Sequence, residues 1–208
     1  MAKPLRLAVF LSGGGTTLQN LIDKIHAGAL DAEIALVLSS REDAYGLERA
    51  RAAGIPTAIL PSRKHRNFDA MSDAIHAHLR EHPVDLIVLA GFMCFFRIPP
   101  EYAGRVMNIH PALIPAFCGK GMYGHRVHKA VLEYGCKISG CTVHFADNEY
   151  DHGPIILQRT VPVLDDDTLE TLAARVFEQE CRAYPEAIQL FAEDRLKLEG
   201  RRVRTYPA

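Results

Sequence analysis

Apolar residues occur along the chain in short continuous runs that alternate with segments of helical periodicity. "LRLAVFLS" at 5–12 is typical of a strand buried on both faces, whereas "TLQNLIDKIHAG" at 17–28 is apolar every three or four positions and ends in glycine, as amphipathic helices do. Asn67 is the expected N-cap of a later helix. The same alternation predicts further strands at 32–40, 55–60, 84–92 and 104–110, and helices at 44–54 and 67–82.

The second half of the chain has a different order of elements. A helix is predicted at 125–135, followed by strands at 137–146 and 153–163 that suit a β-hairpin, and by a long helix at 168–194 that Pro185 is expected to bend. Strands that are apolar on both faces and are joined by helices indicate parallel pairing. We therefore expect one α/β domain: a doubly wound, Rossmann-like, mostly parallel sheet with an antiparallel edge in the C-terminal half.

Composition and charge narrow the classes of function. The net charge of the 208 residues is −1, without the basic field of a nucleic-acid binder, so no nucleic acid is expected as a partner. The longest apolar stretch, at 84–96, is too short to span a bilayer, so no membrane is expected either. The five cysteines form no C-x-x-C and no signal peptide precedes them, which predicts a cytoplasmic protein. The basic residues at 195–204 are expected to lie on a solvated terminal hairpin.

A glycine-rich loop, "SGGGTTLQ" at 12–19, follows the first strand and opens the first helix. Backbone N–H groups at such a position bind phosphate. A dinucleotide fingerprint would need a third glycine where Leu18 stands, and an acidic residue where the second strand ends in Ser40 and Arg41. A Ser-Arg pair suits a 2′-phosphate, so a nicotinamide nucleotide stays open, but a phosphomonoester fits better. The structural alternative is a tight turn that binds nothing.

The predicted strand at 104–110 ends in Asn108 and His110, one residue apart and followed by Pro111. Side chains of a strand alternate between its faces, so these two lie on the same face at the carboxyl end of the strand. There an amide that donates to an oxyanion stands beside an imidazole that carries a proton. The structural alternative is a capping asparagine and a hydrogen-bonded core histidine.

Asp151 lies in the Asp-His-Gly-Pro turn that precedes the strand at 153–163. A carboxylate that faces the imidazole would keep the ring charged and accept protons, although aspartate is also a common turn former. By residue type, His125, His128, His144 and His152 could bind a metal. They belong to no compact ligand set, so no metal is expected.

Five segments together carry a resemblance: "SGGGTTLQNLID", "LAGFM", "NIHPALIPAF", "TVHF" and "YDHGPIILQ". In this order and spacing they resemble the folate-dependent formyltransferase superfamily, and within it the glycinamide ribonucleotide formyltransferases of purine synthesis. The resemblance implies transfer of the formyl group of 10-formyltetrahydrofolate to the amine of 5′-phosphoribosylglycinamide. It implies that Asn108 and protonated His110 hold the oxyanion, while Asp151 keeps His110 charged and moves a proton through water.

The resemblance also implies binding residues. Gly15, Thr16 and Thr17 match the phosphate loop and Glu180 matches a ribose contact, which divides the single domain into a ribotide-phosphate half at 1–109 and a half at 110–208 that completes the catalytic cleft and the folate site. The implied folate contacts are Arg66, Phe92, Met93, Cys94, Phe95, Asn108, His144 and Asp147. Cys94 stands where the family often has arginine, and Phe177 where it often has glutamine. The loop at 117–128 is longer than is usual, and the sequence leaves monomer and homodimer both open.

Four alternatives share part of this pattern. A methionyl-tRNA formyltransferase is expected to carry a further C-terminal domain, and a formyltetrahydrofolate hydrolase an N-terminal regulatory domain. Formyltransferases that act on amino-sugar nucleotides are usually larger chains. A nucleotide-sensing Rossmann module would bind without turnover and would not need Asn108, His110 and Asp151 to converge.

Overall fold

The computed structural model describes residues 3–65 and 67–207, and the chain divides after Met107 into two compact units. The order of the strands in the main sheet is β3-β2-β1-β4-β5-β6-β7, with β8 and β9 in a separate two-stranded sheet. Strand β5, Val106–His110, contains the boundary between the units. The predicted fold class is therefore confirmed.

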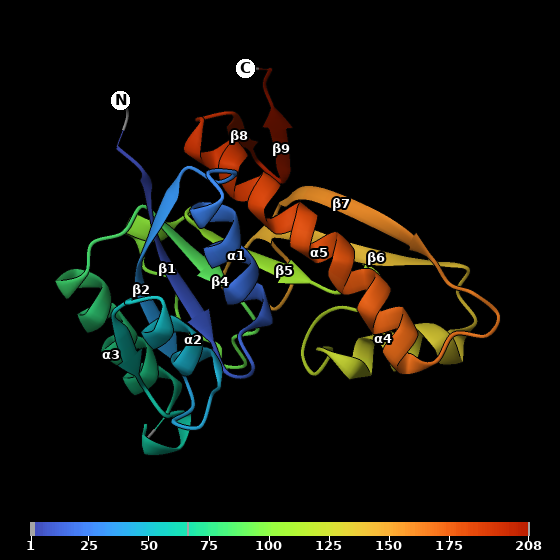
Figure 1. Ribbon diagram of the computed structural model, residues 1–208, viewed down its shortest axis with the longest axis horizontal. Coiled ribbons are helices and arrows are strands. Elements are labelled where there is room, and N and C mark those ends of the chain that lie inside the picture. The colour runs from blue at the N-terminus through green and yellow to red at the C-terminus, as the bar shows by residue number, and fades with distance from the viewer. Residues whose placement is uncertain (1–2, 66, 208) are drawn as a thin grey trace. The chain divides into compact units, whose positions relative to one another are not determined.

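The unit up to Met107 consists of parallel strands and the helices that connect them (Figure 1). Strand β1 pairs in parallel with β2 and with β4, and β2 pairs in parallel with β3. The strands are β1 (Leu5–Leu11), β2 (Ala32–Ser39), β3 (Thr57–Ile59) and β4 (Leu86–Leu89); the helices are α1 (Thr16–His26), α2 (Gly46–Ala52) and α3 (Phe68–Glu81); the 3₁₀ turns are η1 (Ser62–Lys64) and η2 (Pro100–Tyr102).

Strand β1 forms the core of this unit. Leu7 to Leu11 are completely buried, as expected for a strand that is apolar on both faces. At α3 the predicted N-cap is confirmed, because Asn67 Oδ1 accepts a hydrogen bond of 3.0 Å from Ala70 N. These elements match the predicted strands and helices to within a few residues at each end.

The unit from Asn108 begins at the end of β5 and contains the antiparallel pair. Strands β6 and β7 are antiparallel, as predicted, and α5 packs against both (Figure 1). Pro185 lies inside α5, which continues as one helix past it. The elements are α4 (His125–Tyr134), β6 (Ile138–Phe145), β7 (Ile155–Pro162), α5 (Leu169–Ala192), β8 (Leu196–Glu199) and β9 (Arg202–Thr205). The antiparallel β8–β9 pair confirms the predicted terminal hairpin. No helix in the described part of the chain is long and apolar enough to cross a bilayer.

Candidate active site

Asn108, His110 and Asp151 lie together within the second unit. Asp151 Oδ1 accepts a hydrogen bond of 3.3 Å from Asn108 Nδ2, and Asp151 Oδ2 lies 3.6 Å from His110 Nδ1. The side chains of His110 and Asp151 are 4% and 12% exposed, so the pair is largely shielded from water. Three residues that the sequence places on one strand end and one distant turn are therefore one cluster.

The amide of Asn108 is oriented by a buried histidine. His144 Nδ1 donates to Phe145 O at 2.9 Å, so His144 Nε2 is the acceptor that lies 3.1 Å from Asn108 Nδ2. Burial lowers the pKa of His144, which keeps this ring neutral and suited to accept. Both hydrogens of the Asn108 amide are thus engaged, one in the longer contact to Asp151. That contact is the longer of the two, at 3.3 Å against 3.1 Å, and breaking it would free one N–H for a ligand.

The loop after β5 fixes His110 and Asp151 through its backbone. His110 Nε2 donates to Phe117 O at 2.8 Å, so Nδ1 is the ring nitrogen that faces the carboxylate of Asp151. Gly119 N donates to Asp151 Oδ2 at 2.9 Å. Phe117 has a positive φ of 50°, which residue type gave no reason to expect. Part of the unusually long loop at 117–128 therefore serves as a backbone partner of the cluster.

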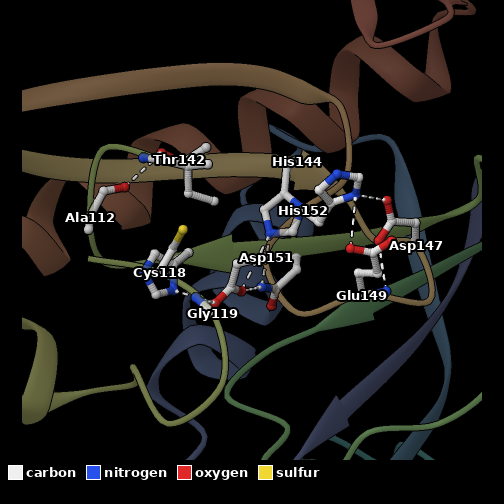
Figure 2. Close-up of polar contacts among 12 residues, drawn as sticks. Ala112, Cys118, Gly119, Thr142, His144, Asp147, Glu149, Asp151 and His152 are labelled. Atoms are coloured by element: carbon white, nitrogen blue, oxygen red, sulfur yellow. Dashed lines mark hydrogen bonds and ion pairs between the residues drawn. The ribbon is translucent and has the colours of Figure 1, made fainter. Parts of the chain in front are cut away.

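Thr142 anchors the segment that immediately follows His110. Its Oγ1 donates to Ala112 O at 2.7 Å and accepts from Ile114 N at 3.1 Å (Figure 2). Thr142 is completely buried, and a polar side chain in such a position is normally hydrogen-bonded. No local pattern in β6 predicted this anchor, because Thr142 shares the strand with two other polar residues, Ser139 and His144.

The Asp-His-Gly-Pro segment is both a turn and part of the cluster. Asp151 has a φ of 52°, in the left-handed region that aspartate tolerates better than most residues. Gly153 lies so close to β6 that a Cβ atom there would stand 1.8 Å from Phe145 O. The turn-forming role and the functional role proposed for Asp151 are therefore compatible.

The described residues near the cluster offer no activated nucleophile. Burial raises the pKa of the Cys118 thiol, and the neighbouring Asp151 carboxylate raises it further. Burial also raises the pKa of Cys141 to about 12. Both thiols stay protonated near neutral pH, and a thiol in that state is a poor nucleophile. Among the described residues, no three His, Cys, Asp or Glu side chains gather as metal ligands.

The glycine-rich loop of the first unit is shaped by its contacts with α2. Gly13 O accepts from Gly46 N at 3.0 Å, and Gly14 O accepts from Arg49 Nε at 2.9 Å. In a trans peptide the C=O and the N–H point in opposite directions. The carbonyls of Gly13 and Gly14 point toward α2, so the N–H groups in the same peptide planes, those of Gly14 and Gly15, point away from it. Gly15 caps α1 with a φ of 70°. This is the backbone arrangement of an anion site at a helix N-terminus.

Gly15→Ala is expected to distort this loop. A Cβ atom at Gly15 would lie 2.5 Å from Gly46 Cα, and the left-handed backbone alone costs an L-residue about 1–2 kcal/mol. We expect a lower melting temperature and a raised KM for a phosphate-bearing substrate. Gly14→Ala is the matched control, because a Cβ atom at Gly14 has open space around it. Equal effects of the two substitutions would contradict this account.

Four of the predicted folate residues of the first unit follow β4: Phe92, Met93, Cys94 and Phe95. Met93 N donates to Ser12 Oγ at 2.8 Å, which ties this segment to the end of β1. The ring of Phe92 packs 5.4 Å from that of Phe10, whereas the ring of Phe95 packs 5.2 Å from Phe68 on α3. Met93 is exposed and Cys94 is half-buried. Arg66 lies outside the described residues.

The predicted folate residues of the second unit occupy different surroundings. His144 is buried against Asn108, as described above, and so supports the cluster directly. Asp147 lies on the exposed loop between β6 and β7, where its Oδ1 accepts from Glu149 N at 2.9 Å. Their assignment to folate stays a prediction.

Glu180 on α5 has an unusual carboxyl group. Burial raises its pKa from 4.5 to about 7, and its carboxylate also contributes to the raised pKa of Cys141. The residue as a whole keeps some exposure, so the carboxyl group is more enclosed than the residue is on average. A desolvated acceptor of this kind suits ligand hydroxyl groups that donate hydrogen bonds to it.

Glu180→Gln is expected to stabilise the protein at alkaline pH while weakening ligand binding. A raised carboxyl pKa favours the folded state fully below about pH 4.5 and loses that effect as the pH rises through about 7. The wild type thus bears a cost above pH 7, on the order of 3 kcal/mol for a shift from 4.5 to about 7, that glutamine removes. Denaturant unfolding at pH 8 and at pH 4.5 measures the difference, which should shrink at the lower pH. A glutamine variant that is less stable at pH 8 would contradict the burial effect.

Comparisons with known proteins place the chain in a family. A family model described as formyl transferase matches residues 5–188. The chain belongs to the formyl transferase family. It is 42% identical over 196 residues to a phosphoribosylglycinamide formyltransferase of Haemophilus influenzae, across 93% of this chain and 90% of that protein. The resemblance drawn from the sequence motifs is therefore confirmed.

Solved structures of the family agree with the fold. The glycinamide ribonucleotide transformylase 1 of Symbiobacterium toebii is 44% identical and superposes with a TM-score of 0.91, over 100% of this chain and 96% of that one. A formyltetrahydrofolate deformylase of Pseudomonas syringae superposes with a TM-score of 0.86 at 25% identity, over 99% of this chain and 67% of that one. The fold is thus common to both, whereas sequence similarity is higher to the transformylase.

Proposed function

We propose that this protein transfers the formyl group of 10-formyltetrahydrofolate to the amine of 5′-phosphoribosylglycinamide, a step of purine biosynthesis. The observation that carries the proposal is the convergence of Asn108, His110 and Asp151 in a shielded cluster. Such a cluster offers an amide donor, an imidazole and a carboxylate, which suit an acyl transfer that needs no enzyme nucleophile. Similarity over most of the chain to phosphoribosylglycinamide formyltransferases supports the choice of substrates.

In the proposed mechanism the substrate amine attacks the formyl carbon directly. The formyl oxygen becomes an oxyanion that the Asn108 amide and the protonated ring of His110 stabilise. Asp151, which lies 3.6 Å from His110 Nδ1, pairs with this ring and accepts the proton that the amine loses. Water carries that proton to the folate nitrogen, the carbon–nitrogen bond of the folate breaks, and tetrahydrofolate leaves. Atoms and charges balance without a further reactant.

We propose that the remaining predicted residues bind the two substrates. Gly15, Thr16 and Thr17 hold the ribotide phosphate through backbone N–H groups at the N-terminus of α1, among them the Gly15 N–H that the Gly14 carbonyl contact directs away from α2. Glu180 accepts from the ribose hydroxyl groups. The predicted folate residues bind 10-formyltetrahydrofolate, and tetrahydrofolate is its released form.

We propose that the enzyme acts in the cytoplasm. All five cysteines are free, which is typical of a reducing compartment.

The experiment that tests the function follows absorbance as 10-formyltetrahydrofolate is converted to tetrahydrofolate, with and without glycinamide ribotide. Ribotide-dependent conversion is the expected result. Conversion at the same rate without ribotide would identify a hydrolase. Folate binding without conversion in either case would point to another amine acceptor.

A further inference from the structure

The loop that carries Asp151 is held by a residue from the C-terminal hairpin. Arg201 lies in the turn between β8 and β9, and its Nη2 donates to His152 O at 2.7 Å. Its Nη1 lies 2.9 Å from His152 Nε2 and 3.4 Å from His152 Nδ1, so the guanidinium also lies against the imidazole ring. A planar guanidinium that donates to a backbone carbonyl and packs against the adjoining ring restrains orientation as well as position. Arg201 therefore contacts both the backbone and the ring of His152, the residue that immediately follows Asp151.

The ring of His152 continues this contact to the start of the loop. An ionised carboxylate only accepts hydrogen bonds, so His152 Nδ1 carries the proton that is donated to Asp147 Oδ2 at 2.8 Å (Figure 2). Asp147 Oδ1 in turn accepts from Glu149 N at 2.9 Å. One chain of hydrogen bonds thus joins Arg201 to both ends of the segment 147–152.

Asp151 has particular need of such support. Its φ of 52° lies in the left-handed region, which residues other than glycine adopt less often than extended or helical backbone. Its carboxylate accepts hydrogen bonds from Asn108 Nδ2 and Gly119 N and also faces His110 Nδ1. A shift of the turn by a fraction of an ångström away from His110 would lengthen the separation of 3.6 Å between Asp151 Oδ2 and His110 Nδ1.

We propose that Arg201 is a positioning residue for the reaction: through His152 it holds the Asp151 carboxylate against His110. The inference rests on the proposed role of Asp151 in catalysis. Arg201 touches no reacting atom in this scheme, so its loss should affect the chemical step rather than the affinity for either substrate. The basic C-terminal hairpin, expected from sequence to be only a solvated element, gains a role in the active site.

The test compares Arg201→Met with Arg202→Met, its exposed neighbour in the same hairpin. Displacement of a catalytic group is expected to lower kcat of Arg201→Met roughly tenfold, while KM for the ribotide and for the folate changes less than about twofold. Arg202→Met should keep the wild-type kcat. Arg201→Lys should restore part of the lost rate, because one ammonium replaces one of the two donors.

A second readout does not depend on turnover. The ¹⁵N signals of the His110 ring, followed through a pH titration, report on the carboxylate that faces Nδ1. They are expected to move in Arg201→Met and to stay in place in Arg202→Met. If wild-type protein lacked ribotide-dependent turnover, the proposed function would fail, and the His110 signals alone would decide the positioning role. Unchanged His110 signals in Arg201→Met, or a loss of rate equal to that of Arg202→Met, would overturn it.

Discussion

Asp151→Asn is expected to lower kcat by about 10²–10⁴, the range that a positioned acid–base group contributes. The substitution removes the carboxylate that lies 3.6 Å from His110 Nδ1 and that is proposed to accept the proton of the amine. KM for the ribotide should change little, because the proposed phosphate and ribose contacts involve other residues. Initial rates under saturating folate, fitted for kcat and KM separately, measure the effect.

Asp151→Asn should change the chemical step without changing the fold. Asparagine is among the few residues that adopt a left-handed backbone readily, so the φ of 52° at this position should be kept. Asp194→Asn is a matched control, because Asp194 has a φ of 53° at the exposed end of α5, outside the cluster. A wild-type kcat in Asp151→Asn would rule out the proposed proton transfer.

Asn108→Ala is expected to lower kcat by about 10²–10³, the usual effect of removing one oxyanion donor. The Asn108 amide lies 3.1 Å from the neutral ring of His144, and this hydrogen bond fixes its orientation before a substrate binds. Substrate affinity should change only modestly, since the oxyanion exists only in the transition state. Stopped-flow measurement of a single turnover separates the chemical step from product release.

Stability has to be measured alongside, because the substitution also leaves His144 Nε2 without its donor. The cost of one such lost hydrogen bond is about 1–3 kcal/mol, and denaturant unfolding would detect it. A folded Asn108→Ala variant whose single-turnover rate equals that of the wild type would show that the amide does not stabilise the transition state.

The sequence predicted the parts of this protein that follow from periodicity and turn chemistry. The strand that ends in Asn108 and His110 formed as expected, because alternation and the following proline determine which side chains project together. The hairpin of β6 and β7 followed from two apolar runs joined by turn residues. The capping role of Asn67 followed from a local hydrogen bond that needs no distant partner.

Other features depend on tertiary contacts that no local pattern encodes. The carbonyl of Phe117 reaches His110 only because the backbone takes a left-handed turn there. Arg201 meets His152 because two elements 49 positions apart fold together, and its residue type suggested only a solvated surface. The raised pKa of Glu180 depends on burial, which the helical period of α5 did not specify.

The central claim is that the formyl carbon passes from the folate to the amine of the ribotide without being released. The most direct measurement uses 10-formyltetrahydrofolate labelled with ¹³C in the formyl group, together with glycinamide ribotide, and follows the label by NMR during turnover. The account predicts that the label appears in the N-formyl group of the ribotide product, in step with tetrahydrofolate formation. Label that appears instead as free formate, at a rate that the ribotide does not change, would contradict it.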